Sequence, residues 1–191
     1  MKKFILLCMF AILTTGCFSG RSPNSKFFVL QKGEEIQPLS SQKTSILVEQ
    51  VIIPDLIYKP QIVLNDKTTS EIKISEFNRW AEPLPDIIRQ TLVDNLQAYL
   101  PNAFIKPELY TTSTSNYRYI LSIEINHFIG TFNNNAILDV WWTLKDSNGK
   151  IKLREKALFS MPIGDTYQSY VIAQSKMIEK LAQQIAQKIT K

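Results

Sequence analysis

The 191-residue sequence has very little cysteine and histidine, and this shortage excludes several kinds of site. It holds two cysteines, Cys8 and Cys17, and one histidine, His127. The rest of the chain therefore has no thiol for a disulfide framework, a cysteine nucleophile or a cysteine-based metal site. A single histidine also excludes a multi-histidine metal centre. We expect no metal ion and no dissociable cofactor.

The amino terminus has the features of an export signal. Two lysines precede the uncharged apolar residues 4–13, which span only about 15 Å as a helix, half of a hydrocarbon core of about 30 Å. This length indicates a signal peptide and not a membrane span. The small residues before Cys17 resemble the cleavage site of bacterial lipoproteins. We therefore expect residues 1–16 to be a lipoprotein signal peptide; the alternative is a plain secretory signal.

Cleavage at this site would make Cys17 the first residue of the mature chain. It would then carry a diacylglycerol and an N-linked acyl group such as palmitate, and three acyl chains make release from a membrane negligible. By the sorting rule of enterobacterial lipoproteins, Phe18 after the cysteine indicates the outer membrane, with the protein facing the periplasm. Residues 17–26 are mostly small or polar and contain Pro23, which predicts a lipidated tether.

The charge of the mature chain is mild. The full sequence has 22 Lys and Arg against 17 Asp and Glu, and 45% hydrophobic residues, values typical of a globular domain. Loss of residues 1–16 removes two lysines and no acid, which leaves 20 basic and 17 acidic residues, a net charge of +3. Nucleic-acid-binding proteins usually concentrate a basic face, so we expect no nucleic-acid partner.

Residues 27–191 are predicted to form a single α+β domain. Prolines at 85 and 101 bracket a helix, and alternating apolar residues indicate strands. The predicted strands are 27–30, 46–53, 61–65, 71–75, 117–128, 135–144 and 151–161, and the predicted helices are 85–100 and 167–188. This order favours an α/β sandwich, in which two main helices pack on one face of a mostly antiparallel sheet.

No catalytic constellation is present in the sequence. His127 lies near the end of a predicted strand, where a partly exposed histidine is commoner than a general base. The glycines form no phosphate-binding loop, and the spacings of serine hydrolases, zinc proteases and nucleotide-binding loops are absent. We therefore assign no catalytic residue and do not expect an enzyme.

Two aromatic motifs are candidates for contact with a partner or ligand. The first is RWAEPLP, with Arg79, Trp80, Glu82, Pro83 and Leu84. It suits either a buried tryptophan, with Arg79 paired to Glu82 or bound to a carbonyl, or a contact surface rich in aromatic and arginine side chains. The second is the pair Trp141 and Trp142, which must face opposite sides of a strand. One should lie in the core, and the other should meet a helix, a partner or lipid.

The order of these motifs resembles the paraquat-inducible protein C family, also called the ABC-type transport auxiliary lipoproteins. The resemblance rests on the lipoprotein signal followed by FFVL, VEQVIIPDLIYKPQIVL, RWAEPLPDIIRQTLVDNL and AILDVWWTL. It implies an outer-membrane lipoprotein that works with an MCE-domain tunnel protein and an inner-membrane component. Such a system moves phospholipid or other apolar molecules across the periplasm and supports envelope integrity. A ring-shaped homo-oligomer would suit docking onto a hexameric tunnel.

Two other functions are compatible with the sequence. The chain could be an assembly or scaffolding lipoprotein that chaperones another membrane complex. The less favoured alternative is a periplasmic hydrolase that uses His127.

Overall fold

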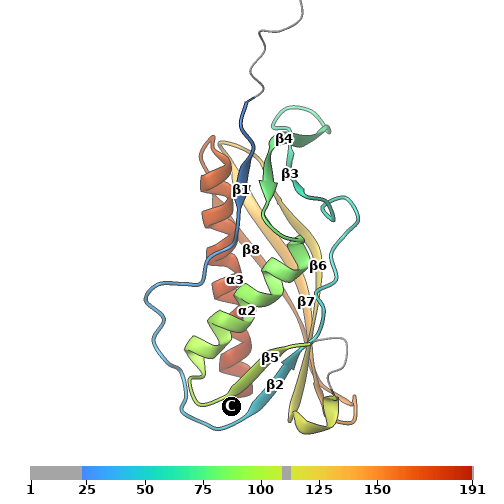
Figure 1. The fold of residues 1–191 in the computed structure, drawn as a ribbon, viewed down its shortest axis with the longest axis vertical. Coiled ribbons are helices and arrows are strands. Elements are labelled where there is room, and N and C mark those ends of the chain that lie inside the picture. Colours follow the sequence, from blue (N-terminus) through green and yellow to red (C-terminus); the bar gives the residue numbers. More distant parts are fainter. Residues whose placement is uncertain (1–22, 109–112, 191) are drawn as a thin grey trace, which may run out of the picture.

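The computed structural model describes residues 23–108 and 113–190, which form two sheets and two long helices (Figure 1). The smaller sheet has the order β1-β4-β3, with β1 (Lys26–Phe28), β4 (Ile72–Trp80) and β3 (Gln61–Asn65). The larger has the order β5-β2-β6-β7-β8, with β5 (Phe104–Pro107), β2 (Ser45–Val48), β6 (Tyr119–Gly130), β7 (Asn135–Asp146) and β8 (Ile151–Pro162). The helices are α2 (Leu84–Tyr99), α3 (Tyr167–Ile189) and the short 3-10 helix η1 (Thr114–Asn116). The predicted signal peptide and Cys17 lie outside the described residues.

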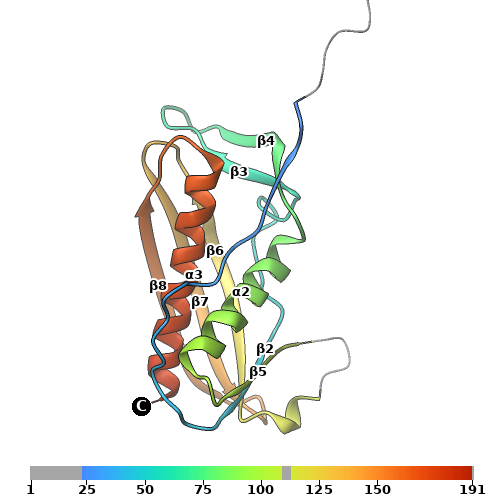
Figure 2. The same ribbon diagram turned by 60° about the vertical axis from the view of Figure 1, so that its left-hand side comes forward.

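The two long helices lie on one side of the larger sheet (Figures 1 and 2). α3 packs on β7 and β8, and α2 packs on α3 and β5. Successive strand residues point to opposite faces, and the face of β7 under the helices is fully apolar, with Ala136, Leu138, Val140, Trp142 and Leu144 all buried. The predicted α+β class and the placement of both helices on one face are confirmed.

The sheets are more mixed than the predicted antiparallel arrangement. β6, β7 and β8 form the expected antiparallel meander, but β2 pairs in parallel with both β5 and β6, and β1 pairs in parallel with β4. β5 was not predicted from the sequence, because its four residues, FIKP, place two apolar residues side by side and give no alternation of apolar and polar residues. The prediction of one mostly antiparallel sheet is therefore corrected to two mixed sheets.

β4 continues five residues beyond the predicted strand because it contains a bulge. Its pairing with β3 passes from Val63↔Ile74 to Gln61↔Arg79, so the intervening residues of β4 are not paired with β3. The hydroxyl oxygen of Ser75 accepts a hydrogen bond from the backbone N–H of Asn78 at 2.9 Å. The bulge breaks the alternation that sequence patterns depend on, and it brings Trp80 to the end of the sheet beside α2.

The segment between β1 and β2 ties the amino-terminal strand to both helices. The backbone N–H of Gln31 donates to the hydroxyl of Ser175 on α3 at 3.1 Å, and that of Gly33 donates to the side-chain oxygen of Asn95 on α2 at 3.0 Å. Asn95 is fully buried and also donates to the carbonyl of Thr91 at 2.8 Å. Hydrogen bonds that it donates to side chains of both helices thus hold this connection in place.

A glycine substitution can test the packing between β6 and α3. A Cβ atom at Gly130 would lie 2.8 Å from Cδ2 of the buried Tyr170, whereas one at Gly164 would have 3.6 Å to its nearest neighbour. We expect Gly130→Ala to lower the free energy of unfolding by about 1–3 kcal/mol through overpacking, and Gly164→Ala to leave it nearly unchanged. Urea unfolding of both variants measures the difference, and equal midpoints would contradict the packing described.

Candidate functional site

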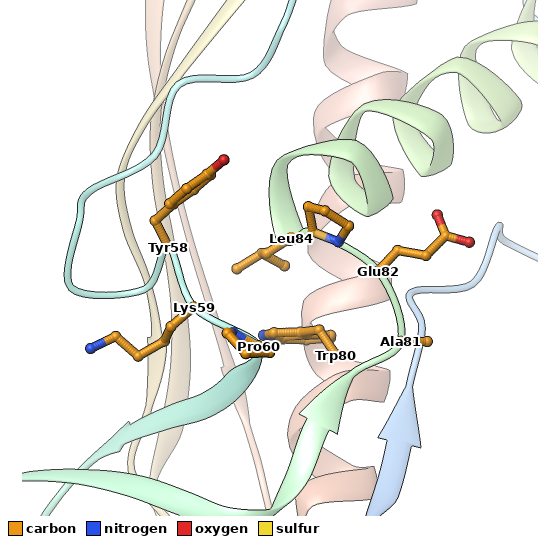
Figure 3. Close-up of a pocket in the computed structure, with 8 residues that line it drawn as sticks. Tyr58, Lys59, Pro60, Trp80, Ala81, Glu82 and Leu84 are labelled. Atoms are coloured by element: carbon orange, nitrogen blue, oxygen red, sulfur yellow. The ribbon is translucent and has the colours of Figure 1, made fainter.

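A predominantly apolar groove lies where β4 ends and α2 begins (Figure 3). It has a volume of about 340 Å³. Two segments that lie side by side in space line it, and their residues are Tyr58, Lys59, Pro60, Trp80, Ala81, Glu82, Pro83 and Leu84. We call this site the Trp80 groove.

Trp80 belongs both to the groove and to the core. Its side chain is 4% exposed, and its ring centroid lies 6.3 Å from that of Phe128 on β6 and 6.4 Å from that of Tyr170 on α3. Its backbone N–H donates to the carbonyl of Pro60 at 2.7 Å. These contacts fix the indole, so a partner would meet a rigid wall instead of a mobile side chain.

A buried hydrogen bond also fixes the side chain of Tyr170. Its hydroxyl donates to the backbone carbonyl of Phe128 at 3.0 Å. Burial raises the pKa of Tyr170, so the hydroxyl stays protonated and remains a donor. Trp80, Phe128 and Tyr170 form a cluster, which we call the aromatic cluster, that joins the smaller sheet, the larger sheet and α3.

The rim of the groove is aromatic and carries one charge of each sign. Tyr58 is 60% exposed, and the Lys59 and Glu82 side chains extend on opposite sides of the groove (Figure 3). Pro60, Pro83 and Leu84 supply rigid apolar surface between them. The lining holds no thiol, hydroxyl of serine or threonine, or histidine, so the site suits apolar contact better than nucleophilic chemistry.

The structure brings together four of the candidate residues of the first motif but not Arg79. Trp80, Glu82, Pro83 and Leu84 line the groove. Arg79 is the strand neighbour of Trp80 and faces the other side of β4, where its Nε donates to the carbonyl of Glu76 at 3.4 Å. The burial of Trp80 and this carbonyl contact match the structural interpretation of the motif, although the groove leaves part of the motif open to a partner.

Sequence reasoning missed the other wall of the groove, which Tyr58, Lys59 and Pro60 provide. These residues precede β3, and the structure brings them beside Trp80 through strand pairing about twenty residues apart. The local sequence there is the short run YKP between two predicted strands, and nothing in this run indicates that it lies beside Trp80.

Trp141 and Trp142 lie far from the groove, on opposite faces of β7. Trp142 is fully buried under the helices. Trp141 is partly exposed on the outer face, where the guanidinium of Arg154 lies 5.0 Å from its ring. Arg154 also pairs with Glu124 at 3.2 Å. Trp142 is therefore part of the core, and Trp141 is the one available for contact.

His127 belongs to a surface cluster of charged side chains. Its side chain is mostly exposed, and its Nδ1 lies 3.8 Å from Oδ2 of Asp139, which also binds Lys156 at 3.0 Å. Partial burial acts to raise the pKa of Asp139, but hydrogen bonds from Lys156 and Asn126 and nearby positive charge outweigh it, and the pKa is lowered. Asp139 thus already pairs with Lys156 and is not dedicated to orienting His127. Among residues 23–108 and 113–190, no group of three His, Cys, Asp or Glu side chains could hold a metal ion.

Comparison with known proteins decides the family. A model of the family described as ABC-type transport auxiliary lipoprotein component matches residues 28–186. The chain belongs to this family. Among curated auxiliary lipoproteins, it is 30% identical to the intermembrane transport lipoprotein PqiC of Escherichia coli (strain K12) over 195 residues, which cover 99% of this chain and 98% of that protein. The PqiC protein of Shigella flexneri matches with the same identity and coverage. The resemblance inferred from the sequence motifs is confirmed.

Solved structures share the fold of this auxiliary lipoprotein. An uncharacterised protein has a TM-score of 0.71 at 21% identity, with 87% of this chain and 99% of that chain covered. A protein of Xanthomonas campestris has a TM-score of 0.65 at 14% identity, with 83% and 90% covered. At these identities the likeness supports the fold alone.

Family membership gives the auxiliary lipoprotein a role in transport. The family is described by that role and not by a reaction it catalyses. Within the part of the chain that the structure describes, no helix is both long and apolar enough to cross a bilayer.

Substitution of Trp80 and of Trp141 can distinguish a tryptophan of the core from one at the surface. Trp80→Ala removes the centre of the aromatic cluster, and we expect it to lower the free energy of unfolding by about 3–5 kcal/mol. Trp141→Ala removes a partly exposed ring and a cation–π contact, for which about 1 kcal/mol is expected. Chemical unfolding followed by far-ultraviolet circular dichroism measures both. A Trp80→Ala variant as stable as Trp141→Ala would contradict the role of Trp80 in the core.

Proposed function

We propose that the protein is an outer-membrane lipoprotein that docks with an MCE-domain tunnel protein in an intermembrane lipid transport system, without catalysis of its own. The observation that carries the proposal is the 30% identity, over nearly the full length of both chains, to a protein named intermembrane transport lipoprotein. The system includes an inner-membrane component and supports envelope integrity.

The proposed anchor is Cys17 with its diacylglycerol and N-acyl group. Cys17 follows an apolar run and small residues, and the residue directly after it is Phe18 and not an acid; this pattern favours lipidation and transfer to the outer membrane. Residues 18–26 then connect the lipid to β1 and reach at most about 30 Å. The folded domain would stay near the membrane, on its periplasmic side.

The proposed docking surface is the Trp80 groove. Interface energy concentrates in apolar pockets with tryptophan, tyrosine and arginine side chains, because a rigid aromatic ring buries much area at little entropic cost. The aromatic cluster holds Trp80 in place before any partner binds, and the exposed Tyr58 can close over a bound side chain. Lys59 and Glu82 at opposite sides would orient a partner segment of complementary charge.

The docking surface can be tested without disturbing the core. Tyr58→Ser removes an exposed ring from the groove, whereas Ile52→Ser removes a similarly exposed side chain, 64% accessible, from outside its lining. We expect Tyr58→Ser to weaken binding to the periplasmic domain of the MCE partner about tenfold or more and Ile52→Ser to leave it unchanged.

Binding is measured with the mature lipoprotein in detergent, after circular dichroism has shown that both variants fold. Equal binding of the two variants would rule out the groove as the docking surface. Failure of the unaltered protein to bind, together with a normal envelope in a strain that lacks both proteins, would overturn the proposed function.

The anchor has its own test. We expect Cys17→Ala to accumulate with the signal peptide attached and without lipid, because the cysteine sulfur is the atom that takes the diacylglycerol. Membrane fractionation and mass spectrometry of the purified protein measure both outcomes. A Cys17→Ala protein that is cleaved and still fractionates with the outer membrane would contradict the proposed anchor, and would leave the groove proposal to its own test.

A further inference from the structure

The direction of β1 determines where the tether leaves the domain. β1 runs parallel to β4, with Lys26 opposite Asn78 and Phe28 opposite Trp80. The chain that precedes Lys26 therefore leads toward the Ile72 end of β4 and the turn between β3 and β4. Figures 1 and 2 both show the start of the described chain at the same end of the molecule as this turn, opposite to the end that bears the carboxyl terminus.

The smaller sheet has one face toward the core, and its other face is partly exposed. Residues paired across a sheet point to the same side. Phe28 and Trp80 are paired, and Trp80 lies on the side of the buried Ile62 and Leu64. This side is the inner face.

The outer face is formed by the alternate residues. Phe27 pairs with Arg79, which pairs with Gln61, while Ile74 pairs with Val63 and Ile72 with Asn65. The β3 partners Gln61, Val63 and Asn65 are spaced two residues apart, so neighbouring pairs across the sheet are about 6.6 Å apart along the strand. Phe27, Ile74 and Ile72 thus share one face, and they are 65%, 52% and 38% exposed, whereas Val63 on the same face is buried.

Scattered exposed apolar side chains are normal on a protein surface, but these three share one face at the end where the tether leaves. The charged side chains of the smaller sheet and its turn nearly balance. Lys26, Lys67, Lys73 and Arg79 stand against Asp66, Glu71 and Glu76, a net charge of +1. The most closely spaced pair, Lys73 and Asp66, is already bonded. The face is therefore suited to apolar contact with only weak attraction to anionic groups.

We propose that this outer face, with Phe27, Ile72 and Ile74 at its centre, rests in the headgroup region of the phospholipid leaflet that holds the Cys17 anchor. The inference rests on the proposed lipidation. A tether of at most about 30 Å keeps the face at high effective concentration near the leaflet, so contacts too weak to bind a free protein suffice. Aromatic and aliphatic side chains are those that insert at the boundary between headgroups and acyl chains.

The contact would fix the orientation of the domain. Phe27 and Trp80 lie on opposite faces of the same sheet, so seating of the outer face on lipid leaves the Trp80 groove directed away from the leaflet. A partner that approaches from the periplasm would then find the groove open.

The absence of other thiols from residues 18–191 allows a sharp test. Ile74→Cys in the full lipidated protein can be labelled with a thiol-reactive NBD fluorophore. Leu158→Cys, at a 67% exposed position on β8, is the matched control. The proteins are reconstituted in vesicles of phosphatidylethanolamine and phosphatidylglycerol at 3:1, with and without doxyl-labelled lipid. We expect at least twofold quenching at position 74, a blue-shifted emission there, and little change at position 158.

A second substitution tests whether the apolar face causes the contact. Phe27→Ser should reduce the quenching at position 74 at least by half. Ile151→Ser, which alters an exposed side chain beside the turn between β7 and β8, should leave it unchanged.

Three results would overturn the proposal. Weak and equal quenching at positions 74 and 158 would show that the face does not meet lipid. Blue-shifted emission at position 74 in detergent, insensitive to doxyl lipid, would show that another protein surface, such as a second copy, covers it. Reaction of the otherwise unaltered protein with the fluorophore would reveal a free Cys17 or a retained Cys8, and either would overturn the anchor itself. Loss of binding to the MCE partner, by contrast, would leave the lipid contact intact.

Discussion

The packing of Trp80 against Phe128 and Tyr170 is the contact on which the remaining architecture depends. Trp80 ends β4, Phe128 belongs to β6, and Tyr170 lies in the first turn of α3, so three rings join three layers that have no continuous hydrogen-bonded ladder between them. The buried hydroxyl of Tyr170 is satisfied by the carbonyl of Phe128, which avoids the cost of an unpaired polar group. The same cluster positions the smaller sheet and forms the back of the groove.

Because Trp80 is both core and groove, the site cannot be altered at its centre without a loss of stability. A variant of Trp80 that loses a function would therefore not distinguish contact from stability. The rim differs, since Tyr58 is exposed and contributes little to the core. The structure thus separates the residues that give the groove its shape from those that a partner can reach.

Sequence patterns predicted the parts of the fold that are locally encoded. Pro85 and Pro101 bracket α2, and the long alternation of β6 and β7 requires one apolar and one mixed face. The bulge after Ile74 and the short strand β5 were not predictable in this way, because a bulge interrupts the period and β5 depends on its neighbour β2 for definition. The aromatic cluster was partly predictable: a buried Trp80 was one interpretation of its motif, but its partners lie far along the chain.

The same distinction applies to the candidate site. The contiguous half of the groove, Trp80 to Leu84, was found from its unusual residues, whereas Tyr58 and Pro60 reach it through pairing between β3 and β4. The parallel pairing of β1 with β4 could not be seen in three residues of sequence, yet it sets the direction in which the tether leaves. One short strand thereby links the position of the proposed lipid anchor to the orientation of the proposed docking groove, because Phe27 faces outward next to Arg79 while Phe28 faces inward next to Trp80.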